Sequence, residues 1–149
     1  MSWHLFAAAD PELAAFGKER LHDKVAYLAT IRTDGAPRLH PVRPIVGDDH
    51  LFVFMEPTSP KGDDLRRDGR YVLHGPVTDP GSEPWELYEF CVDGRAALVE
   101  DPAVRQVANA VTSFSRDAHF ILFELSVESA FSTVYGADGQ PVRRRWQAS

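Results

Sequence analysis

Residues 38–65 combine the residue types and the spacing of an anion-binding site. The basic stretch Arg38-Leu-His-Pro-Val-Arg43 is followed by an apolar stretch and then by Ser59-Pro-Lys61. The Ser-Pro step is typical of a helix start, where unpaired backbone N–H groups and the positive end of the helix dipole favour a phosphate. Lys61 adds an ammonium group within the same turn, so this part of the chain predicts a seat for a phosphate.

Two other interpretations of this segment stay open. The Ser-Pro step also begins helices that bind nothing, and Asp63 and Asp64 fit such a helix because acids in the first turn complement its dipole. Arg38 and Arg43 are five residues apart, so a regular strand directs their side chains to opposite faces. The two arginines converge on one anion only if proline distorts the strand.

The other residues that could carry chemistry are few. None of the six histidines forms a short-spaced ligand pair, and Cys91 is the single cysteine, so the sequence predicts no metal site and no internal disulfide. The sequence also lacks the glycine-rich phosphate loops and the serine nucleophile elbow. His40, inside the basic stretch, is the one candidate for a catalytic residue.

The C-terminal segment holds a second group of candidate binding residues. Arg143-Arg144-Arg145-Trp146 places an indole beside cations, a combination that suits a planar anionic ligand through stacking and ion pairing. The turn-like Tyr135-Gly-Ala-Asp-Gly139 predicts a hairpin over 134–146, and a disordered basic tail is the alternative. Tyr88 is expected to be a core or interface aromatic.

Strands dominate the elements that must position these residues. Asp10-Pro11 predicts a helix that runs to Leu21, and 25–31 is a short apolar stretch expected to be a strand buried on both faces. Asp34-Gly35 predicts a hairpin into a strand over 37–46. This strand contains three prolines, which exclude a regular central position and predict an edge strand or a ladder opened by bulges.

The remaining segments continue this pattern. Further strands are expected over 51–55, 71–74, 85–99 (one long strand, or a hairpin bent near 93–94) and 120–127, with a loop over 79–84 and helices over 59–68 and from Asp101 onward. Apolar residues at 104, 107, 108 and 111 give the last helix one apolar side. Six or seven strands, mostly adjacent in sequence, and about three short helices predict a mainly β (α+β) fold built as an antiparallel barrel.

Composition limits the class of protein. With 149 residues, 44% of them hydrophobic and 26% charged, the chain is expected to be one globular domain over 1–149. The formal net charge of −6 argues against nucleic acid as a partner, because phosphate backbones bind basic surfaces. The start of the chain lacks the pattern of a signal peptide, and no stretch approaches the roughly 20 apolar residues of a membrane span. We therefore expect a soluble, cytoplasmic protein.

The chain resembles the pyridoxamine 5′-phosphate oxidase-like family of FMN-binding split β-barrels, in the form of a small bacterial member. The resemblance runs from the strand at 25–31 to the strand that ends near 127. It is sharpest at Arg38-Leu-His-Pro-Val-Arg43 and Phe54-Met-Glu-Pro-Thr-Ser-Pro-Lys61. It implies a six- to seven-stranded antiparallel split β-barrel with short peripheral helices, and a homodimer with cofactor sites at the subunit interface.

The resemblance also implies which residues bind FMN. Arg38 and Arg43 match the basic residues of the first strand, and Phe54 and Met55 match the strand end that contacts the cofactor. Ser59-Pro60-Lys61 matches a Ser-Arg-Lys step that holds the phosphate, with proline in place of the arginine. The implied cofactor-binding set is Arg38, Leu39, His40, Pro41, Val42, Arg43, Phe54, Met55, Ser59 and Lys61. The implied substrate or partner-subunit site consists of Tyr88, Arg144 and Trp146.

The activity implied by the resemblance is that of an FMN-dependent oxidoreductase acting on an unidentified small molecule, with the flavin performing hydride or electron transfer. A reductase dependent on the deazaflavin coenzyme F-420 is the alternative enzyme, and Arg66, Arg67 and Arg70 are then expected to meet the polyanionic tail of that coenzyme. A non-enzymatic protein that binds flavin or haem is the third interpretation.

Overall fold

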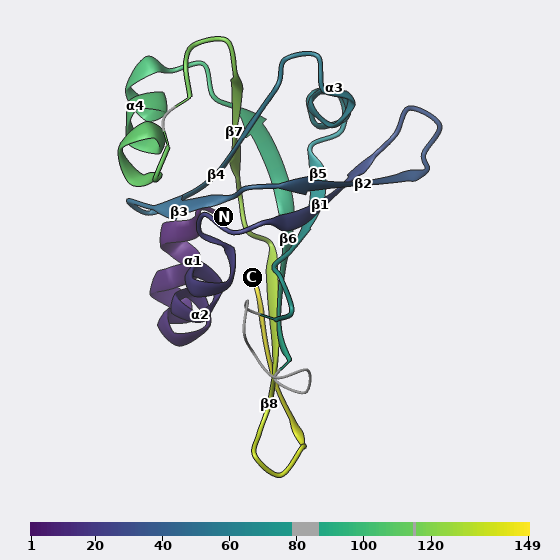
Figure 1. Cartoon of the computed structure of the whole chain (residues 1–149), viewed down its shortest axis with the longest axis vertical. Coiled ribbons are helices and arrows are strands. Elements are labelled where there is room, and N and C mark those ends of the chain that lie inside the picture. Colours follow the sequence, from purple (N-terminus) through teal and green to yellow (C-terminus); the bar gives the residue numbers. More distant parts are fainter. Residues whose placement is uncertain (79–86, 115) are drawn as a thin grey trace.

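Two antiparallel sheets that share one long strand form the framework of the chain (Figure 1). The computed structural model describes residues 1–78, 87–114 and 116–149, and the expected loop over 79–84 lies outside them. The hydrogen-bonded order β2-β1-β5-β6-β7-β4-β3, extended by β8 and β9 on one side of β6, confirms the mainly β split barrel. The described strands are β1 Ala26–Ile31, β2 Pro37–Val42, β3 Ile45–Gly47, β4 His50–Met55, β5 Arg70–His74, β6 Tyr88–Leu98, β7 Ile121–Leu125, β8 Ser129–Tyr135 and β9 Pro141–Gln147.

β6 joins the two sheets as one continuous strand, not as a bent hairpin. Residues 88–93 pair with β8 and residues 96–98 pair with β7, so the strand changes neighbours around Gly94. A Cβ added at Gly94 would overlap the carbonyl oxygen of Ser126, so only glycine allows this close crossing. The hydroxyl of Tyr71 donates to the same carbonyl oxygen (2.8 Å), which ties β5 to the crossing as well.

β2 lies at the edge of its sheet, as its prolines predicted. The turn that precedes it places Gly35 at φ +82°, a conformation that glycine adopts without steric cost. The predicted strand over 37–46 is divided in two, because β2 ends at Val42 and β3 begins at Ile45. Arg43 and Pro44 fill the interruption, and this break decides where the Arg43 side chain lies.

The outer face of β1, β2 and β5 is uncovered. Tyr27, Leu39 and Val72 are 49%, 66% and 43% exposed there, whereas Ala26 and Leu28 on the inner face are fully buried. The expectation that the strand at 25–31 is buried on both faces is therefore wrong for the single chain. Its apolar outer residues leave a surface that no described part of this chain covers.

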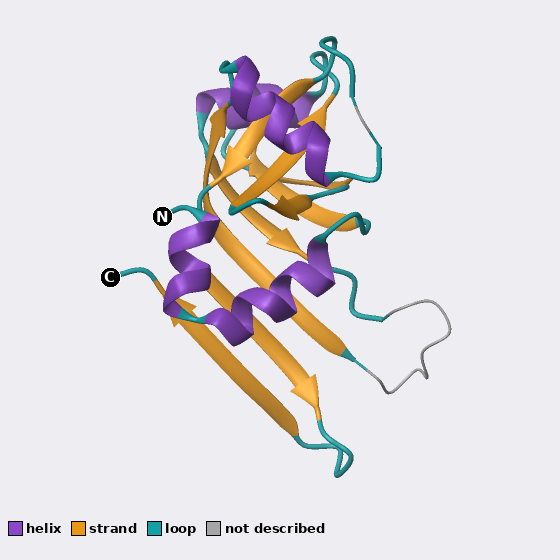
Figure 2. Ribbon diagram, turned by 90° about the vertical axis from the view of Figure 1, so that its left-hand side faces the viewer, coloured by secondary structure: helices purple, strands orange, loops and turns teal. Residues whose placement is uncertain are grey.

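The helices pack in two groups at different ends of the sheets. They are α1 Trp3–Ala9, α2 Pro11–Leu21, α3 Pro60–Arg67 and α4 Pro102–Val111, and the first of them was not predicted. Asp10 and Asp101 cap α2 and α4 as predicted, by accepting hydrogen bonds from backbone N–H groups of the first turn. Figure 2 shows the two N-terminal helices lying across the strands that lead to the β8–β9 hairpin, apart from the helices at the other end. None of the described helices is long and apolar enough to cross a membrane.

Candidate functional site

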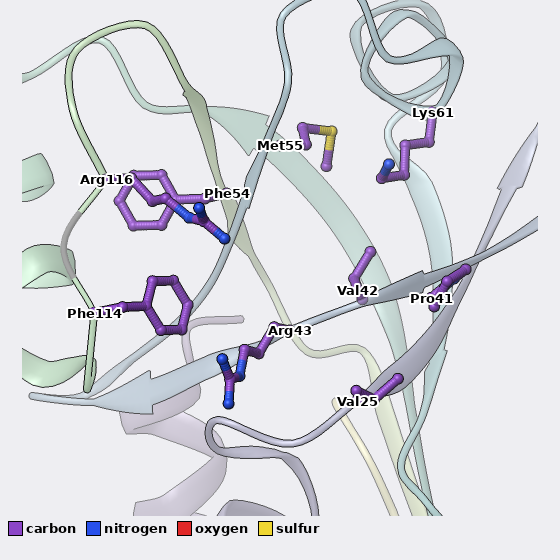
Figure 3. Close-up of a pocket in the computed structure, with 9 residues that line it drawn as sticks. All are labelled: Val25, Pro41, Val42, Arg43, Phe54, Met55, Lys61, Phe114 and Arg116. Carbon is purple, nitrogen blue, oxygen red and sulfur yellow. The ribbon is translucent and has the colours of Figure 1, made fainter.

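A pocket of about 280 Å³ opens beside the end of β2, between β4, the start of α3 and the connection that follows α4 (Figure 3). Its walls combine three cationic side chains with apolar and aromatic ones. The lining residues are Val25, Pro41, Val42, Arg43, Phe54, Met55, Lys61, Phe114 and Arg116. Of the expected cofactor-binding set, this pocket therefore includes Pro41, Val42, Arg43, Phe54, Met55 and Lys61.

Lys61 enters the pocket from the first turn of α3, which begins at Pro60 as the sequence predicted. Ser59 occupies the cap position, but its hydroxyl makes no capping bond and instead accepts a hydrogen bond from Lys61 Nζ (2.9 Å). Burial lowers the pKa of Lys61 below its usual 10.5, because a buried ammonium loses hydration. An anion bound beside this group would offset that cost.

Arg43 and Arg116 line the pocket, and both lie against the ring of Phe114 in cation–π contacts. The guanidinium carbon of Arg43 lies 5.0 Å from the ring centroid of Phe114, and that of Arg116 lies 4.7 Å from the same centroid. Arg116 also lies over Phe120 at 4.8 Å. Arg43 Nε donates to the backbone carbonyl of Asp23 (3.1 Å), which holds this arginine at the break between β2 and β3.

Arg38 lies outside this pocket and is paired with an acid. Its Nε contacts Asp64 Oδ2 at 2.6 Å, and Asp64 also accepts from Thr30 Oγ1 (2.7 Å) and Arg67 Nη2 (3.3 Å). Burial alone would raise the pKa of Asp64, but the hydrogen bonds from Arg38, Thr30 and Arg67 outweigh it and hold that pKa below 3.8. Asp64 is thus the buried partner of Arg38 and not simply a first-turn acid. Arg38 and Arg43 have different partners and do not converge.

The other residues of the expected cofactor set do not line the pocket. Leu39 is 66% exposed on the outer face of β2, and Ser59 is buried beneath Lys61. His40 is partly buried on the same face of β2 as Arg38. Burial lowers the pKa of His40, the charges of Lys61 and Arg38 lower it further, and Asp64 opposes them. This environment favours the neutral imidazole.

The expected substrate or partner-subunit residues are engaged elsewhere in the single chain. Arg144 pairs with Asp10 (2.7 Å) and with Glu12 at the start of α2. The ring centroids of Trp146 and Phe6 lie 4.8 Å apart. The guanidinium carbon of Arg20 lies over the ring of Tyr88, 5.5 Å from its centroid. β8 and β9 pair antiparallel from Ser129 and Gln147 to Tyr135 and Pro141, which confirms the predicted C-terminal hairpin in place of a disordered tail. β8 and β9 lead away from α3 and α4 (Figure 1).

Sequence reasoning missed Val25, Phe114 and Arg116. The connection between α4 and β7 places the last two beside Arg43, although more than 70 residues of sequence separate them. An aromatic residue two positions before an arginine was the available signal. An aromatic residue close to arginines also occurs in Arg143-Arg144-Arg145-Trp146, where the longer run of arginines makes the pattern more conspicuous.

Asp23, which precedes β1, binds the start of the connection between α4 and β7. Its carboxylate accepts hydrogen bonds from the Ser113 backbone N–H (3.0 Å) and from Thr112 Oγ1 (3.2 Å). Burial acts to raise the pKa of Asp23, but these hydrogen bonds and the nearby His22 outweigh it and lower the pKa below 3.8. Asp23 therefore positions the residues that precede Phe114.

Asp23→Asn should loosen this attachment, because an amide offers one acceptor oxygen where the carboxylate offers two. We expect hydrogen exchange of the Ser113 amide to accelerate about tenfold, as the loss of one charge-assisted hydrogen bond implies. Asp48→Asn is the matched control, since Asp48 has a similar backbone conformation (φ 49° against 54°) on an exposed turn. Unchanged exchange at Ser113, measured by NMR, would rule out the attachment.

A model of the family described as pyridoxamine 5′-phosphate oxidase matches residues 9–134 of the chain. No curated protein matches the sequence significantly. Among the described residues, no group of three or more His, Cys, Asp or Glu side chains is arranged to hold a metal ion.

Several solved structures share the fold. A haem-binding protein from Mycobacterium smegmatis is 17% identical with a TM-score of 0.72, over 91% of this chain and 57% of that protein, so this chain spans little more than half its length. The haem storage protein HutZ of Vibrio cholerae is 18% identical with a TM-score of 0.57, over 80% of this chain and 89% of that protein. PhzG of Burkholderia lata, solved with tetrahydrophenazine-1-carboxylic acid, is 16% identical with a TM-score of 0.63, over 97% of this chain and 86% of that protein. At such identities the likeness shows the fold.

Proposed function

The chain belongs to the pyridoxamine 5′-phosphate oxidase family, and we propose that its pocket binds FMN for an oxidoreductase reaction on a small molecule. One observation carries the proposal. Lys61, Arg43 and Arg116 line the pocket, and none of them is paired with a carboxylate in the part of the chain that the structure describes. Cations left without acids in a protein of net charge −6 favour an anionic ligand.

The chemistry of the walls fits a phosphorylated flat ring. Lys61, held by Ser59, would bind the phosphate, and Val42, Phe54 and Met55 would contact the ring. FMN, when bound, would supply the hydride or electron transfer itself. His40 remains a candidate proton carrier, and its neutral imidazole could accept a proton near the site.

This arrangement departs from the one that the resemblance implied. Pro60 removes one cation from the phosphate seat, and Asp64 neutralises Arg38. Arg43 and Arg116 add positive charge to the pocket, but on the side away from Lys61. The proposal therefore rests on Lys61 for the phosphate.

We also propose a cytoplasmic homodimer with the cofactor at the subunit interface. The exposed apolar residues Tyr27, Leu39 and Val72 support an interface on the outer face of β1, β2 and β5. A pocket of about 280 Å³ lies just below the range of about 300–1,000 Å³ for ligand sites, so walls from a second copy would complete it. In that assembly Tyr88, Arg144 and Trp146 would line the partner's site.

Haem binding without catalysis is the second candidate, because two of the similar structures are those of haem-binding or haem storage proteins. The pocket lining favours flavin over haem. Within the described residues it includes no histidine, cysteine or tyrosine, and Met55 is the one member of the common haem ligands that it contains. A deazaflavin coenzyme is disfavoured, since Arg66, Arg67 and Arg70 already pair with Asp63, Asp64 and Asp68.

Lys61→Met should weaken FMN binding by about 10- to 100-fold, the loss expected for one charge-assisted contact to a phosphate. Quenching of flavin fluorescence measures the affinity. Riboflavin, which lacks the phosphate, should bind the variant and the native protein equally. Lys18→Met is the control, because Lys18 is exposed on α2 away from the pocket.

The same titrations test the alternatives. FMN affinity should fall as pH rises through the lowered pKa of Lys61, at a pH below 10.5, and Lys61→Arg should keep its affinity there. Absence of FMN binding, or an equal effect of Lys61→Met on riboflavin, would refute the FMN site. A visible absorption band of coordinated haem after haem addition, without FMN binding, would select the second candidate.

A further inference from the structure

We infer that Arg43 and Arg116 form a second anion-binding subsite in the pocket, separate from Lys61, so that the pocket selects flat ligands or ligand pairs with acidic groups at two ends. The inference rests on the proposed function only in taking this pocket as the binding site. It names a ligand class that a phosphate seat at Lys61 alone would not require.

The cations of the pocket fall into two groups. Lys61 reaches in from α3, whereas Arg43 and Arg116 lie on the other side of Val42 and Met55 (Figure 3). The side chains between the two groups are apolar, so a flat uncharged body can lie between the ends. One anion close to Lys61 would leave the arginine pair without a counter-ion.

The arginine pair is held in place before any ligand arrives. Both guanidinium carbons lie over the ring of Phe114, that of Arg116 lies over Phe120 as well, and Arg43 donates a hydrogen bond to the Asp23 carbonyl. A guanidinium group that lies against a ring still has N–H groups that can donate to a bidentate acid such as a carboxylate or sulfonate. Two guanidinium charges near one ring repel each other, and an anion bound beside them lowers that repulsion.

Many of the other arginines of the chain already have an acidic partner. Seven of them in the described residues pair with Asp or Glu, namely Arg32, Arg38, Arg66, Arg67, Arg70, Arg95 and Arg144. Arg105, also without a carboxylate partner in the described residues, bonds to the backbone carbonyls of Asp117 and Phe120 instead. Arg43 and Arg116 line the pocket and have no carboxylate partner in the same ranges, so an acid of the ligand can pair with them there.

Two matched probes test the inference without using a flavin. Anthraquinone-2-sulfonate carries one acid on a flat body, and anthraquinone-2,6-disulfonate carries two at opposite ends. We expect the disulfonate to bind about tenfold tighter or more, because each end contributes a charge-assisted contact. Lys61→Met and Arg116→Gln should each weaken the disulfonate about tenfold. Each should change the monosulfonate by about twofold at most, since one acid can use either end.

Controls separate charge from folding. Arg116→Lys keeps the charge and should retain most of the disulfonate affinity, and Arg145→Gln removes an exposed charge on β9 and should change nothing. The melting temperature of each variant identifies loss of folding. Combining Lys61→Met with Arg116→Gln should abolish binding of both probes. If all three cations formed a single anion site, the monosulfonate would already bind much more weakly after either change alone.

Equal affinity of the two probes for the native protein would overturn the inference, as would equal losses of both probes in Arg116→Gln. These outcomes are distinct from failure of the proposed function. FMN binding that depends on Lys61, together with equal binding of the probes, refutes the second subsite alone. The expected probe pattern without FMN binding refutes the flavin alone.

Discussion

Replacing Asp64 with alanine should lower the free energy of unfolding by about 3 kcal/mol, the low end of the cost of removing one partner from a buried ion pair. The side chain of Asp64 is 3% exposed and accepts hydrogen bonds from Arg38, Thr30 and Arg67. Alanine leaves the Thr30 hydroxyl without its partner and the Arg38 charge unbalanced. The value lies at the low end because Arg38 is 28% exposed and regains some water.

Urea denaturation at neutral pH measures the effect. Asp63→Ala on the same helix is the control, because Asp63 is 68% exposed and lies 3.7 Å from Arg66, a surface pair worth about 0.5 kcal/mol or less. A loss for Asp64→Ala no larger than for Asp63→Ala would contradict the assigned role. The affinity for FMN should fall as well, since α3 carries Lys61.

The same carboxylate predicts a pH dependence. The pKa of Asp64 is lower in the folded chain than its ordinary value of 3.8, so its contribution is fully present above pH 3.8 and is lost as pH falls through the lowered value. Native protein should therefore lose stability in that acidic range more steeply than the Asp64→Ala variant. Equal slopes of the two proteins would show that Asp64 keeps an ordinary pKa.

Gly94→Ala should destabilise the chain by about 3 kcal/mol or more, at the upper end of the range for inserting a methyl group into a filled site. The added Cβ would overlap the Ser126 carbonyl oxygen and lie 2.9 Å from its carbonyl carbon. Backbone cannot move aside as a flexible side chain can. Ser126 is also bonded to Arg95 through its backbone N–H (2.8 Å) and to Tyr71 through its carbonyl (2.8 Å), so a shift would disturb the crossing of the sheets.

Thermal unfolding and urea denaturation of Gly94→Ala measure this cost. Gly139→Ala is the matched control, because Gly139 lies at φ +73° with no atom within 4 Å of an added Cβ. Its cost is then only that of the left-handed backbone, about 1–2 kcal/mol. If Gly94→Ala costs no more than Gly139→Ala, the strand crossing is looser than the structure indicates.

Most elements of the fold could be predicted from local sequence. Asp10-Pro11 and Asp101-Pro102 mark the starts of α2 and α4, and Asp34-Gly35 marks the β1–β2 turn, because caps and tight turns depend on a few neighbouring residues. α1 was missed although Ser2 caps it, since its stability comes from Trp3 and Phe6, which pack in the core. The Trp146 ring that covers Phe6 comes from the other end of the chain.

The candidate site could be predicted only in part. Pro41, Val42, Arg43, Phe54, Met55 and Lys61 were expected from one continuous segment, and the pocket contains them. Arg116 and Phe114 were not expected, because their place depends on how α4 packs and on the attachment to Asp23. Arg38 was expected beside an anion, but the acid that neutralises it belongs to the chain itself.

The sequence by itself determined the antiparallel barrel, its edge strand, the start of α3 at Ser59-Pro60 and the cationic character of the 38–65 segment. These properties follow from turns, caps, prolines and side-chain charge, all of which act over a few residues. Only the tertiary structure decided which cations stay without an acid. Asp64 reaches Arg38 across 26 residues and leaves Arg43, Lys61 and Arg116 facing the pocket. Charge pairing depends on distance in space, which sequence spacing does not specify.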